Sequence, residues 1–478
     1  MTVPKTPAKP ATVFTDTDTA TSTGTATDGS AHVHDLIGIG LGPFNLGLAA
    51  LADPIDELDC LFLEARDRFD WHPGMLLDDA TLQVPFMADL VTMADPTSRF
   101  SFLNFLKQTG RIYPFYIRES FLPHRREYNQ YCQWVAERLD SVRFGQQVTS
   151  VEHDGETYVV TTASGETHRT RRLVLGTGTA PHVPEPAQEA LAGDGPAIHS
   201  ADYLARKDEL VGRRSVTVVG SGQSAAEVYL DLLNAQPDHD YQLAWLTRSP
   251  RFFSMEYTKL TLELTSPEYS AYFQSLPADK RERLLKSQQS LYKGISGDTI
   301  DAIHEALYTR SVEGSAETTL LTNTELRGVT RTDEGYHLAL HHVEQEEDYE
   351  MATDAMVLAT GYRAGVPAFL EPVRDRIRFD EHGRYDASST FSVDHTDREI
   401  WVQNGEEHTH GFVAPDLGMG AYRSSMILAA VLGREPYPVE KRVAFQEFGV
   451  PDRFRILSKH SQPSRILSKH SQPTEETR

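Results

Sequence analysis

Cysteine is almost absent from this sequence, which has only Cys60 and Cys132 in 478 residues. The two lie far apart and form no Cys-x-x-Cys motif, which argues against a disulfide framework, a cysteine-based zinc site and a dithiol redox centre. Apolar runs are also short, since none reaches the roughly 20 residues of a membrane-spanning helix. The first residues lack the apolar core of a signal peptide, so we expect a cytoplasmic protein that does not bind membranes.

Positive charge is scarce as well. The chain has 46 Lys and Arg against 69 Asp and Glu, a formal net charge of −23 and an isoelectric point near 5.2. This balance argues against nucleic acid as a partner and is compatible with a small cationic substrate. The length is sufficient for two or three domains with a substantial core.

Residues 35–50 contain the first chemical motif. A short apolar strand, 36–39, leads into a helix that should begin near Pro43, and the turn between them is formed by Gly38, Gly40 and Gly42. Glycine at these positions lets backbone N–H groups approach a pyrophosphate at the helix N-terminus. The next apolar run ends in Glu64, where an acid would bind a ribose hydroxyl. The pattern predicts a dinucleotide site.

A second copy of the pattern occupies residues 215–230, with Gly220 and Gly222 in the turn. The strand that follows leads to Arg248 and Arg251 rather than to a carboxylate. Arginine binds a ribose 2′-phosphate through paired hydrogen bonds, so this copy is interpreted as an NADPH site and the first as an FAD site. The alternative is that both arginines are solvated surface residues.

Two nucleotide sites predict a flavoprotein that takes hydride from NADPH. The expected fold class is α/β, with two Rossmann-like dinucleotide-binding domains for FAD and NADPH and a small helical substrate-binding insertion. The predicted parts are a disordered tail (1–31), a discontinuous FAD-binding domain (32–205 and 350–445), an NADPH-binding domain (206–254 and 313–349), the insertion (255–312) and a flexible tail (446–478). The last contains a duplicated nonapeptide, 455–463 and 465–473.

Some residues allow two interpretations. Trp71 and His72 lie in an irregular aromatic stretch that could form a wall around a flavin ring or simply pack in the core. His408 and His410 resemble a metal-binding pair, but no third ligand has suitable spacing. Hydrogen bonding to backbone or flavin is therefore favoured for both histidines, and we predict no metal site.

Between about residues 34 and 445, the chain resembles the class B flavin-dependent N-hydroxylating monooxygenases of siderophore biosynthesis, which include the ornithine and lysine N-hydroxylases. The motifs that carry the resemblance are Gly38-x-Gly40-x-Gly42-Pro43, Trp71-His72-Pro73-Gly74-Met75, Gly220-Ser221-Gly222-Gln223-Ser224, Leu358-Ala359-Thr360-Gly361-Tyr362 and Thr409-His410-Gly411. The related Baeyer–Villiger motif is not found. Each motif recurs among flavoenzymes, but the ordered set is specific.

The resemblance implies roles for individual residues. Trp71 and His72 contact the flavin, and Gln83 lies against its ring as the catalytic residue. Gln223 and Ser224 lie at the NADP pyrophosphate, and Arg248 binds the 2′-phosphate. Thr360 and Gly361 are also predicted to bind a cofactor, although the Thr-Gly-Tyr sequence could instead have a structural role in closing a strand at the domain junction. Asp202 replaces a second phosphate-binding Lys of some members, so the NADPH preference depends largely on Arg248.

The resemblance also implies the reaction. NADPH reduces FAD, O₂ adds to give a C4a-hydroperoxyflavin, and a neutral primary amine attacks its distal oxygen while NADP⁺ stays bound. An alkyl amine has a pKa of about 10.4, so the site must desolvate or deprotonate the reacting nitrogen. Family members suggest a homo-oligomer, either a dimer or a tetramer.

Departures from the family pattern indicate the substrate. Amino-acid hydroxylases of the family hold the substrate's α-carboxylate with a Lys, an Asn and a Ser. In this chain the matching positions are Ala88, Leu262 (directly before Glu263) and Gly418. Burying a substrate carboxylate without these partners would cost several kcal/mol of binding free energy. An aliphatic diamine, putrescine or cadaverine, fits better, and Leu291 joins Glu263 in the predicted substrate site. The predicted product is an N-hydroxydiamine for a hydroxamate siderophore.

Rival hypotheses remain open from sequence. Lys259 or Arg423 could hold a carboxylate instead, which would make the protein an ornithine or lysine hydroxylase. An uncoupled NADPH oxidase and a degenerate flavin-fold binding protein are further alternatives. Candidate acids for the second ammonium of a diamine are Asp89, Glu263 and Asp298, although a role as surface or capping carboxylate is favoured for each.

Overall fold

The computed structural model describes residues 32–314 and 316–455. The predicted N-terminal tail lies outside these residues, as does the duplicated nonapeptide beyond Arg455. Within the described part of the chain, no helix is both long enough and apolar enough to span a membrane.

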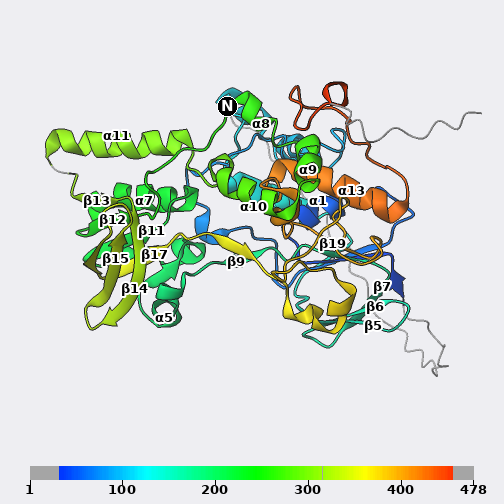
Figure 1. Cartoon of the computed structure of the whole chain (residues 1–478), viewed down its shortest axis with the longest axis horizontal. Helices are drawn as coiled ribbons and strands as arrows, with labels where there is room; N and C mark the ends of the chain where they lie inside the picture. The colour runs from blue at the N-terminus through cyan, green and yellow to red at the C-terminus, as the bar shows by residue number, and fades with distance from the viewer. Residues whose placement is uncertain (1–31, 315, 456–478) are drawn as a thin grey trace, which may run out of the picture. The chain divides into compact units, whose positions relative to one another are not determined.

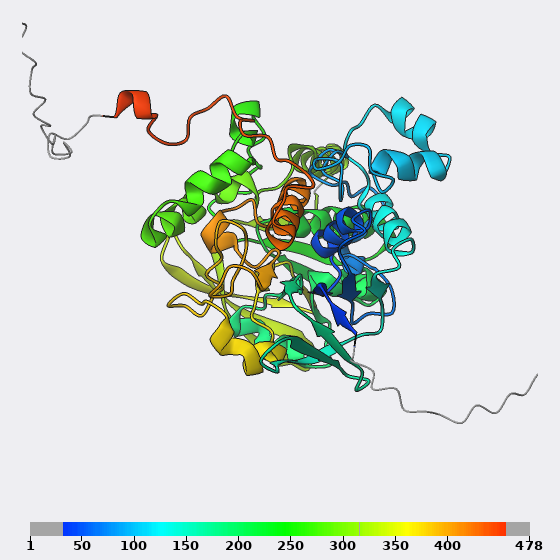
Figure 2. The ribbon, with the colours of Figure 1, turned by 90° about the vertical axis from the view of Figure 1, so that its right-hand side faces the viewer.

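The first parallel sheet contains the first glycine motif. Its strand order is β19 (Ile400–Val402), β8 (Leu173–Leu175), β2 (Leu36–Ile39), β3 (Cys60–Leu63) and β4 (Val142–Arg143). Every neighbouring pair is parallel, and β2 is completely buried, which explains its uninterrupted apolar sequence. Helix α1 (Pro43–Ala52) follows β2 and packs against α13 (Gly420–Leu432), as Figures 1 and 2 show in blue and orange.

The second parallel sheet contains the second glycine motif. Its strand order is β10 (Ala197–His199), β17 (Ala355–Leu358), β11 (Ser215–Val219), β12 (Gln242–Leu246) and β13 (Thr318–Leu321). Helices α6 (Tyr203–Val211) and α7 (Gln223–Ala235) pack on it, and an antiparallel sheet is formed by β14 (Thr324–Thr332), β15 (Gly335–His342) and β16 (Glu347–Thr353). The predicted α/β class with two Rossmann-like folds is confirmed.

Two predicted domain boundaries differ from the strand pairing. The FAD-binding domain was expected to include residues up to 205 and from 350 onward, yet β10 and β17 both belong to the second sheet. Strand β17 lies between β10 and β11 and is parallel to both. A buried strand needs hydrogen-bonding neighbours on each side. This requirement moves residues 197–199 and 355–358 into the NADPH-side fold.

Short antiparallel strands accompany the chain as it passes between the two parallel sheets. Strand β9 (Thr179–Pro181) lies between β8 and β10 in sequence, and β18 (Tyr362–Ala364) lies between β17 and β19. The two pair with each other, so the outgoing and returning segments run side by side. A separate sheet contains β1 (Val33–His34), β7 (Thr167–Thr170), β6 (Tyr158–Thr162) and β5 (Val148–His153).

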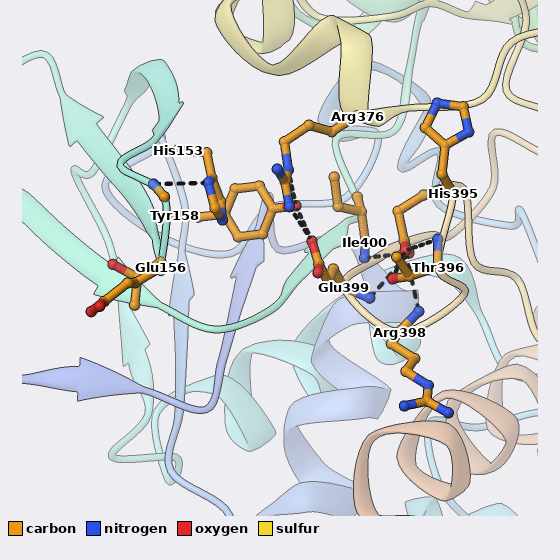
Figure 3. A network of polar contacts seen from close by, with 12 residues as sticks. His153, Glu156, Tyr158, Arg376, His395, Thr396, Arg398, Glu399 and Ile400 are labelled. Atoms are coloured by element: carbon orange, nitrogen blue, oxygen red, sulfur yellow. Dashed lines mark hydrogen bonds and ion pairs between the residues drawn. The ribbon is translucent and has the colours of Figure 1, made fainter.

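A partly buried polar network fixes β19, an edge strand of the first sheet (Figure 3). The Glu399 carboxylate accepts hydrogen bonds from the Tyr158 hydroxyl and from Arg376, both at 2.7 Å. Asp394, which is 2% exposed, accepts from the backbone N–H groups of Glu399 and Ile400 at 3.0 and 2.9 Å. Charge-assisted bonds of this kind hold the loop before β19 against β6.

The predicted helical insertion is present, but its helices pack on different parts of the protein. It contains α8 (Lys259–Leu262), α9 (Pro267–Gln274), α10 (Ala278–Ser287) and α11 (Gly297–Glu313). Helices α9 and α10 pack against α12 (Glu407–His410), whereas α11 packs against α7 of the NADPH-side fold. The insertion therefore contacts both the His-Gly motif and the second nucleotide fold.

Two helices on the FAD side are α2 (Phe102–Gln108) and α4 (Arg125–Ala136). Helix α4 buries Tyr128, Tyr131, Cys132 and Val135 on one face. Helix α3 (Ile112–Arg118) follows α2, and α5 (Gln188–Ala192) precedes β10.

Candidate active site

The first glycine turn combines positions that packing requires with one that it leaves open. A Cβ on Gly40, whose φ is +84°, would lie 2.6 Å from the carbonyl oxygen of Gly176. A Cβ on Gly38 would lie 2.2 Å from the ring of Phe62. Gly42, directly before Pro43 at the start of α1, has nothing within 4 Å of such a Cβ. Open space at a helix N-terminus fits an incoming pyrophosphate.

The Glu64 carboxylate lies at this turn, as the sequence predicts. One of its oxygens accepts a hydrogen bond from the backbone N–H of Leu41 at 2.7 Å, and the other accepts from the N–H of Arg66 at 3.0 Å. Glu64 is buried and directly follows β3. An acceptor-rich group held beside the glycine turn is suited to binding ribose hydroxyls.

Sequence analysis missed Asn45, which joins two loops of the FAD-side fold. Its side-chain amide donates to the carbonyl of Gly40 at 2.7 Å, and its oxygen accepts from the Gln403 amide at 2.7 Å. A Cβ on Gly176 would lie 2.4 Å from the Asn45 side chain. Asn45 thus fixes the glycine turn against the loop after β8. A buried polar residue in an otherwise apolar helix was the available signal.

Trp71 and His72 lie in an aromatic cluster. The His72 ring is edge-on to those of Trp71 and Tyr362, with centroids 5.0 and 5.1 Å apart. Burial, and then the nearby Arg125 and Arg66, lower the pKa of His72 to about 4. The imidazole is therefore neutral at physiological pH. The backbone of His72 is left-handed, with φ of 50°, which turns the chain immediately before Pro73.

Gln83 has a buried polar atom that fits a bound cofactor. Its Nε2 is buried and has no hydrogen-bond partner among the described residues, while its backbone carbonyl accepts from the Tyr257 hydroxyl at 3.1 Å. The Tyr362 hydroxyl is likewise buried and unpaired within the described part of the chain. Buried polar groups in folded proteins are normally hydrogen-bonded, so such atoms suit a ligand with many polar atoms, as FAD has.

The second glycine turn requires glycine at Gly220 and leads directly into the N-terminus of α7. A Cβ on Gly220 would lie 2.3 Å from the carbonyl oxygen of Ala359, so glycine is required where the turn meets the end of β17. Gly222 directly precedes α7, and a Cβ there would lie 3.3 Å from a backbone oxygen of Lys293. Ser224 is in the first turn of α7. Both residues are at a helix N-terminus, which suits a phosphate.

The Gln223 side chain joins α7 to α11. Its oxygen accepts from the backbone N–H of Ser296 at 2.7 Å, and its Nε2 donates to Thr299 and Glu227 at 3.0 and 2.8 Å. The resemblance implies contact with the NADP pyrophosphate, but in this structure the amide is engaged within the protein. This leaves its backbone, rather than its side chain, to contact a phosphate.

Arg248 lies after β12 with its side chain 77% exposed and its guanidinium 4.0 Å from the Glu325 carboxylate. Such a weakly paired cation is compatible with 2′-phosphate binding and with a solvated surface residue. Thr360 and Gly361 lie at the junction between the folds: the Thr360 hydroxyl donates to the carbonyl of His182, and the Gly361 carbonyl is 3.1 Å from Nε2 of His199.

The structure brings together two of the predicted substrate positions that are far apart in sequence. A Cβ on Gly418 would lie 3.7 Å from the Cβ of Ala88. Leu262 is 46% exposed at the end of α8, and the Glu263 carboxylate accepts from the backbone N–H groups of residues 445 and 446. Leu291 is half-buried against the cluster of apolar side chains beneath α9.

The cations considered for a substrate carboxylate are poorly placed for that task. Arg423 is 1% exposed, lies 3.0 Å from the Glu406 carboxylate and donates to the carbonyl of Ala414 at 2.7 Å. Lys259 is exposed at the start of α8. The buried arginine is neutralised by Glu406, so a substrate carboxylate would have to compete with an existing ion pair.

The candidate acids have other partners or positions. Asp89 accepts hydrogen bonds from the backbone N–H groups of Val91, Thr92 and Phe102 and holds the start of α2. Asp298 is exposed in the first turn of α11. Sequence analysis missed Asp416, whose Oδ1 accepts from the N–H of Gly418 at 2.7 Å. Its position two residues before Gly418 was the available signal.

The two histidines of the late motif make protein contacts. Nε2 of His408 lies 2.7 Å from the carbonyl oxygen of Tyr385, which confirms backbone hydrogen bonding for this residue. His410 stacks on Phe391 with ring centroids 4.4 Å apart, and its Nδ1 is 2.9 Å from the Thr409 hydroxyl. Burial, and then Arg423, lower the pKa of His410 to about 3. Both histidines therefore support the packing of α12.

The family model of L-lysine 6-monooxygenase/L-ornithine 5-monooxygenase matches residues 32–364. The chain belongs to this family. The family's monooxygenase chemistry accounts for the two nucleotide folds, the open N-terminus of α1 and the unpaired Gln83 amide. The protein is a flavin-dependent N-hydroxylating monooxygenase with FAD and NADPH as cofactors.

Several relatives within this monooxygenase family are similar over most of their length. The putrescine N-hydroxylase of Shewanella oneidensis is 50% identical over 425 residues, which cover 87% of this chain and 84% of the relative. The structure of DfoA, a cadaverine monooxygenase from Erwinia amylovora bound to FAD, is 50% identical with a TM-score of 0.85, covering 88% of this chain and 99% of that one. The ornithine N-hydroxylase of Kutzneria sp. 744, with reduced FAD, NADP⁺ and L-ornithine, is 28% identical with a TM-score of 0.78, covering 84% and 99%.

Proposed function

We propose that this monooxygenase hydroxylates one primary amine of an aliphatic diamine, putrescine or cadaverine, to supply an N-hydroxydiamine for a hydroxamate siderophore. The observation that carries the proposal is the contact between positions 88 and 418. Both residues are small and uncharged there, and a Cβ on Gly418 would nearly touch that of Ala88. A substrate carboxylate at this place would have no ammonium to pair with from either residue.

The similar proteins support a diamine over an amino acid. Relatives named for putrescine and cadaverine are 50% identical to this chain, whereas the L-lysine N6-monooxygenase of Escherichia coli is 32% identical. Arg423, the buried alternative cation, is paired with Glu406. The similar proteins and the pairing of Arg423 therefore both argue against an ornithine or lysine hydroxylase.

The chain's own residues would bind and orient the reactants. FAD, reduced by NADPH, would supply the activated oxygen that the amine nitrogen attacks. We infer that the first turn of α1 and Glu64 hold FAD, that Gly220, Gly222 and Ser224 lie at the NADP phosphates, and that Arg248 holds the 2′-phosphate. Neutral His72 and the rings around it would exclude water, which favours the uncharged amine.

The Gln83 amide is the group proposed to touch the flavin ring. Its Nε2 donor is buried, and its backbone is held by Tyr257. A donor fixed in this way can hydrogen-bond a ring heteroatom without reorganising.

We further propose that the protein is a cytoplasmic homo-oligomer, either a dimer or a tetramer. Light scattering of the purified enzyme would test the oligomeric state.

Product formation per NADPH consumed tests the proposed function. Putrescine, cadaverine, ornithine and lysine would be offered separately to the FAD-loaded enzyme, with hydroxylamine and peroxide both measured. We expect hydroxylamine to match NADPH consumption for a diamine and little hydroxylamine from either amino acid. Product mainly from ornithine or lysine would overturn the proposal, and peroxide alone with all four would favour an NADPH oxidase.

A further inference from the structure

The carboxylate of Asp416 lies beside the two positions that lack the expected polar side chains. Oδ1 accepts the N–H of Gly418 at 2.7 Å, and a Cβ on Gly418 would lie 3.1 Å from this oxygen and 3.7 Å from the Cβ of Ala88. The other oxygen, Oδ2, has no hydrogen bond or ion pair within residues 32–314 and 316–455. Asp416 is only half-buried, so a ligand could reach it.

Tyr257 connects this carboxylate with the cofactor side. Its hydroxyl donates to the backbone carbonyl of Gln83 at 3.1 Å. Burial, and then the charge of Asp416, raise the pKa of Tyr257, which shows that the phenol also lies within electrostatic reach of the carboxylate. Tyr257 thus bonds the backbone of the residue proposed to touch the flavin and is influenced by the charge of Asp416.

We propose that the Asp416 carboxylate binds the ammonium of the diamine that is not hydroxylated. This assignment rests on the proposed function and makes Asp416 the residue that selects a diamine over an amino acid. Oδ2 is the oxygen that would accept from the ammonium, because Oδ1 is already bonded to Gly418.

The negative charge of Asp416 is the physical reason for a preference for diamines. At this place the related amino-acid hydroxylases are expected to present a cation to a substrate carboxylate, whereas this chain presents an anion. An anion attracts the remote ammonium of a diamine and repels the carboxylate of an amino acid, so a single residue acts on both. Burial raises the pKa of Asp416, whereas the N–H of Gly418 and the charge of Arg423 lower it, and Arg423 is itself ion-paired with Glu406.

The other carboxylates considered are less suitable. Asp89 has four hydrogen bonds from the backbone and Thr92, and Glu263 holds the backbone at residues 445 and 446. Glu406 lies 3.0 Å from Arg423 and is fully buried. Of these acids, Asp416 combines a hydrogen bond to Gly418, partial access and an oxygen without a partner in the described part of the chain.

The Asp416→Asn variant removes the negative charge and keeps the hydrogen bond to Gly418, because an Asn side-chain oxygen can still accept from the N–H of Gly418. KM and kcat would be measured with putrescine and with butylamine, which lacks the second ammonium, and putrescine binding would be measured by calorimetry. We expect KM for putrescine to rise about tenfold or more with a small change in kcat, and the preference over butylamine to shrink by the same factor.

A matched control is Asp279→Asn, the same chemical change at an exposed residue of α10 that pairs with Arg283. It should leave both KM values unchanged. Unaltered putrescine selectivity and affinity in folded Asp416→Asn enzyme would overturn the inference, as would an equal loss for butylamine. If the Asn variant does not fold, Ala88→Lys tests the same carboxylate by placing an ammonium beside it.

Failure of the inference and failure of the proposed function give different results. A wild-type enzyme that prefers ornithine or lysine would refute the diamine assignment whatever the variant does. A wild-type enzyme that hydroxylates putrescine, together with an Asp416→Asn variant that keeps its diamine preference, would refute only the role of Asp416.

Discussion

Arg125 of α4 and Glu227 of α7 form a two-point ion pair that joins the FAD-side and NADPH-side folds. The two guanidinium nitrogens lie 2.7 and 2.9 Å from the two carboxylate oxygens, and Glu227 is 7% exposed. Paired bonds restrict rotation as well as separation. Because hydride must pass from one nucleotide to the other, this contact between the folds bears directly on cofactor geometry.

Removing Arg125 is expected to destabilise the protein strongly. Arg125→Ala leaves the Glu227 carboxylate buried without its cation, which costs about 3–5 kcal/mol. Denaturant unfolding of the FAD-loaded enzyme would measure the loss. The control is Arg126→Ala at the next residue, whose partner Asp78 is 89% exposed, and which should change stability by less than about 1 kcal/mol. Equal effects from both variants would contradict a structural role for the buried pair.

Introducing a cation at position 88 should impair diamine binding. The ammonium of Ala88→Lys would lie close to Asp416 and compete with the substrate for it, so we expect KM for putrescine to rise about tenfold or more. Steady-state kinetics with putrescine and butylamine would measure this change. Ala278→Lys, at the exposed first residue of α10, is the control for an added charge. An unchanged KM in Ala88→Lys would show that position 88 is remote from the substrate.

Two glycines of the first turn should respond differently to alanine. Gly40→Ala forces a Cβ against the Gly176 carbonyl at a left-handed φ, so we expect poor folding. Gly42→Ala meets nothing within 4 Å and has an ordinary φ of −83°. It should fold normally yet lose FAD. Circular dichroism and bound FAD would be measured for both, and a Gly42→Ala enzyme with full FAD content would contradict pyrophosphate binding at this turn.

Arg248 should determine the choice between NADPH and NADH. If its guanidinium binds the 2′-phosphate, Arg248→Ala should raise KM for NADPH about tenfold or more and leave KM for NADH nearly unchanged. Flavin reduction rates at varied cofactor concentration would measure both constants. Arg327→Ala removes a neighbouring exposed arginine that also contacts Glu325 and serves as the control. Identical KM changes for the two cofactors would identify Arg248 as a surface charge.

Asp394 should stabilise the fold in a pH-dependent way. Burial alone would raise its pKa, but hydrogen bonds from Ser392, Thr396 and backbone N–H groups lower it well below the ordinary value. A lowered folded-state pKa contributes stability above the unfolded pKa of about 3.9, and this stability is lost as pH falls through the folded value. Asp394→Asn should therefore cost about 2–3 kcal/mol near neutral pH.

The difference between wild type and Asp394→Asn should shrink on acidification below about pH 4, because the carboxylate of the unfolded wild-type chain then takes up a proton while the folded one stays ionised. Urea unfolding at several pH values would measure it. The comparison is Asp386→Asn. The Asp386 carboxylate has no set of hydrogen bonds like that of Asp394 within the described residues. A difference that is constant with pH would show that the Asp394 charge contributes little.

Local sequence determined the nucleotide folds and the cofactor class. Strand, glycine turn, helix and terminal acid are contiguous, so residues 36–64 were sufficient to predict β2, α1, β3 and the position of Glu64. Glycine at 40 and 220 was also predictable, because a tight turn restricts the backbone locally. The missing polar residues at 88 and 418 could be identified from the sequence by comparison with family motifs.

Tertiary structure decided what depends on distant pairing. Strands β10 and β17 belong to the second sheet because parallel neighbours, not nearby residues, satisfy their hydrogen bonds. The engagement of Gln223 with α11 and of Arg423 with Glu406 depends on helices that meet only in the folded chain. The approach of Ala88 to Gly418, whose N–H the Asp416 carboxylate accepts, arises in the same way: two segments remote in sequence define a charge environment that neither specifies alone.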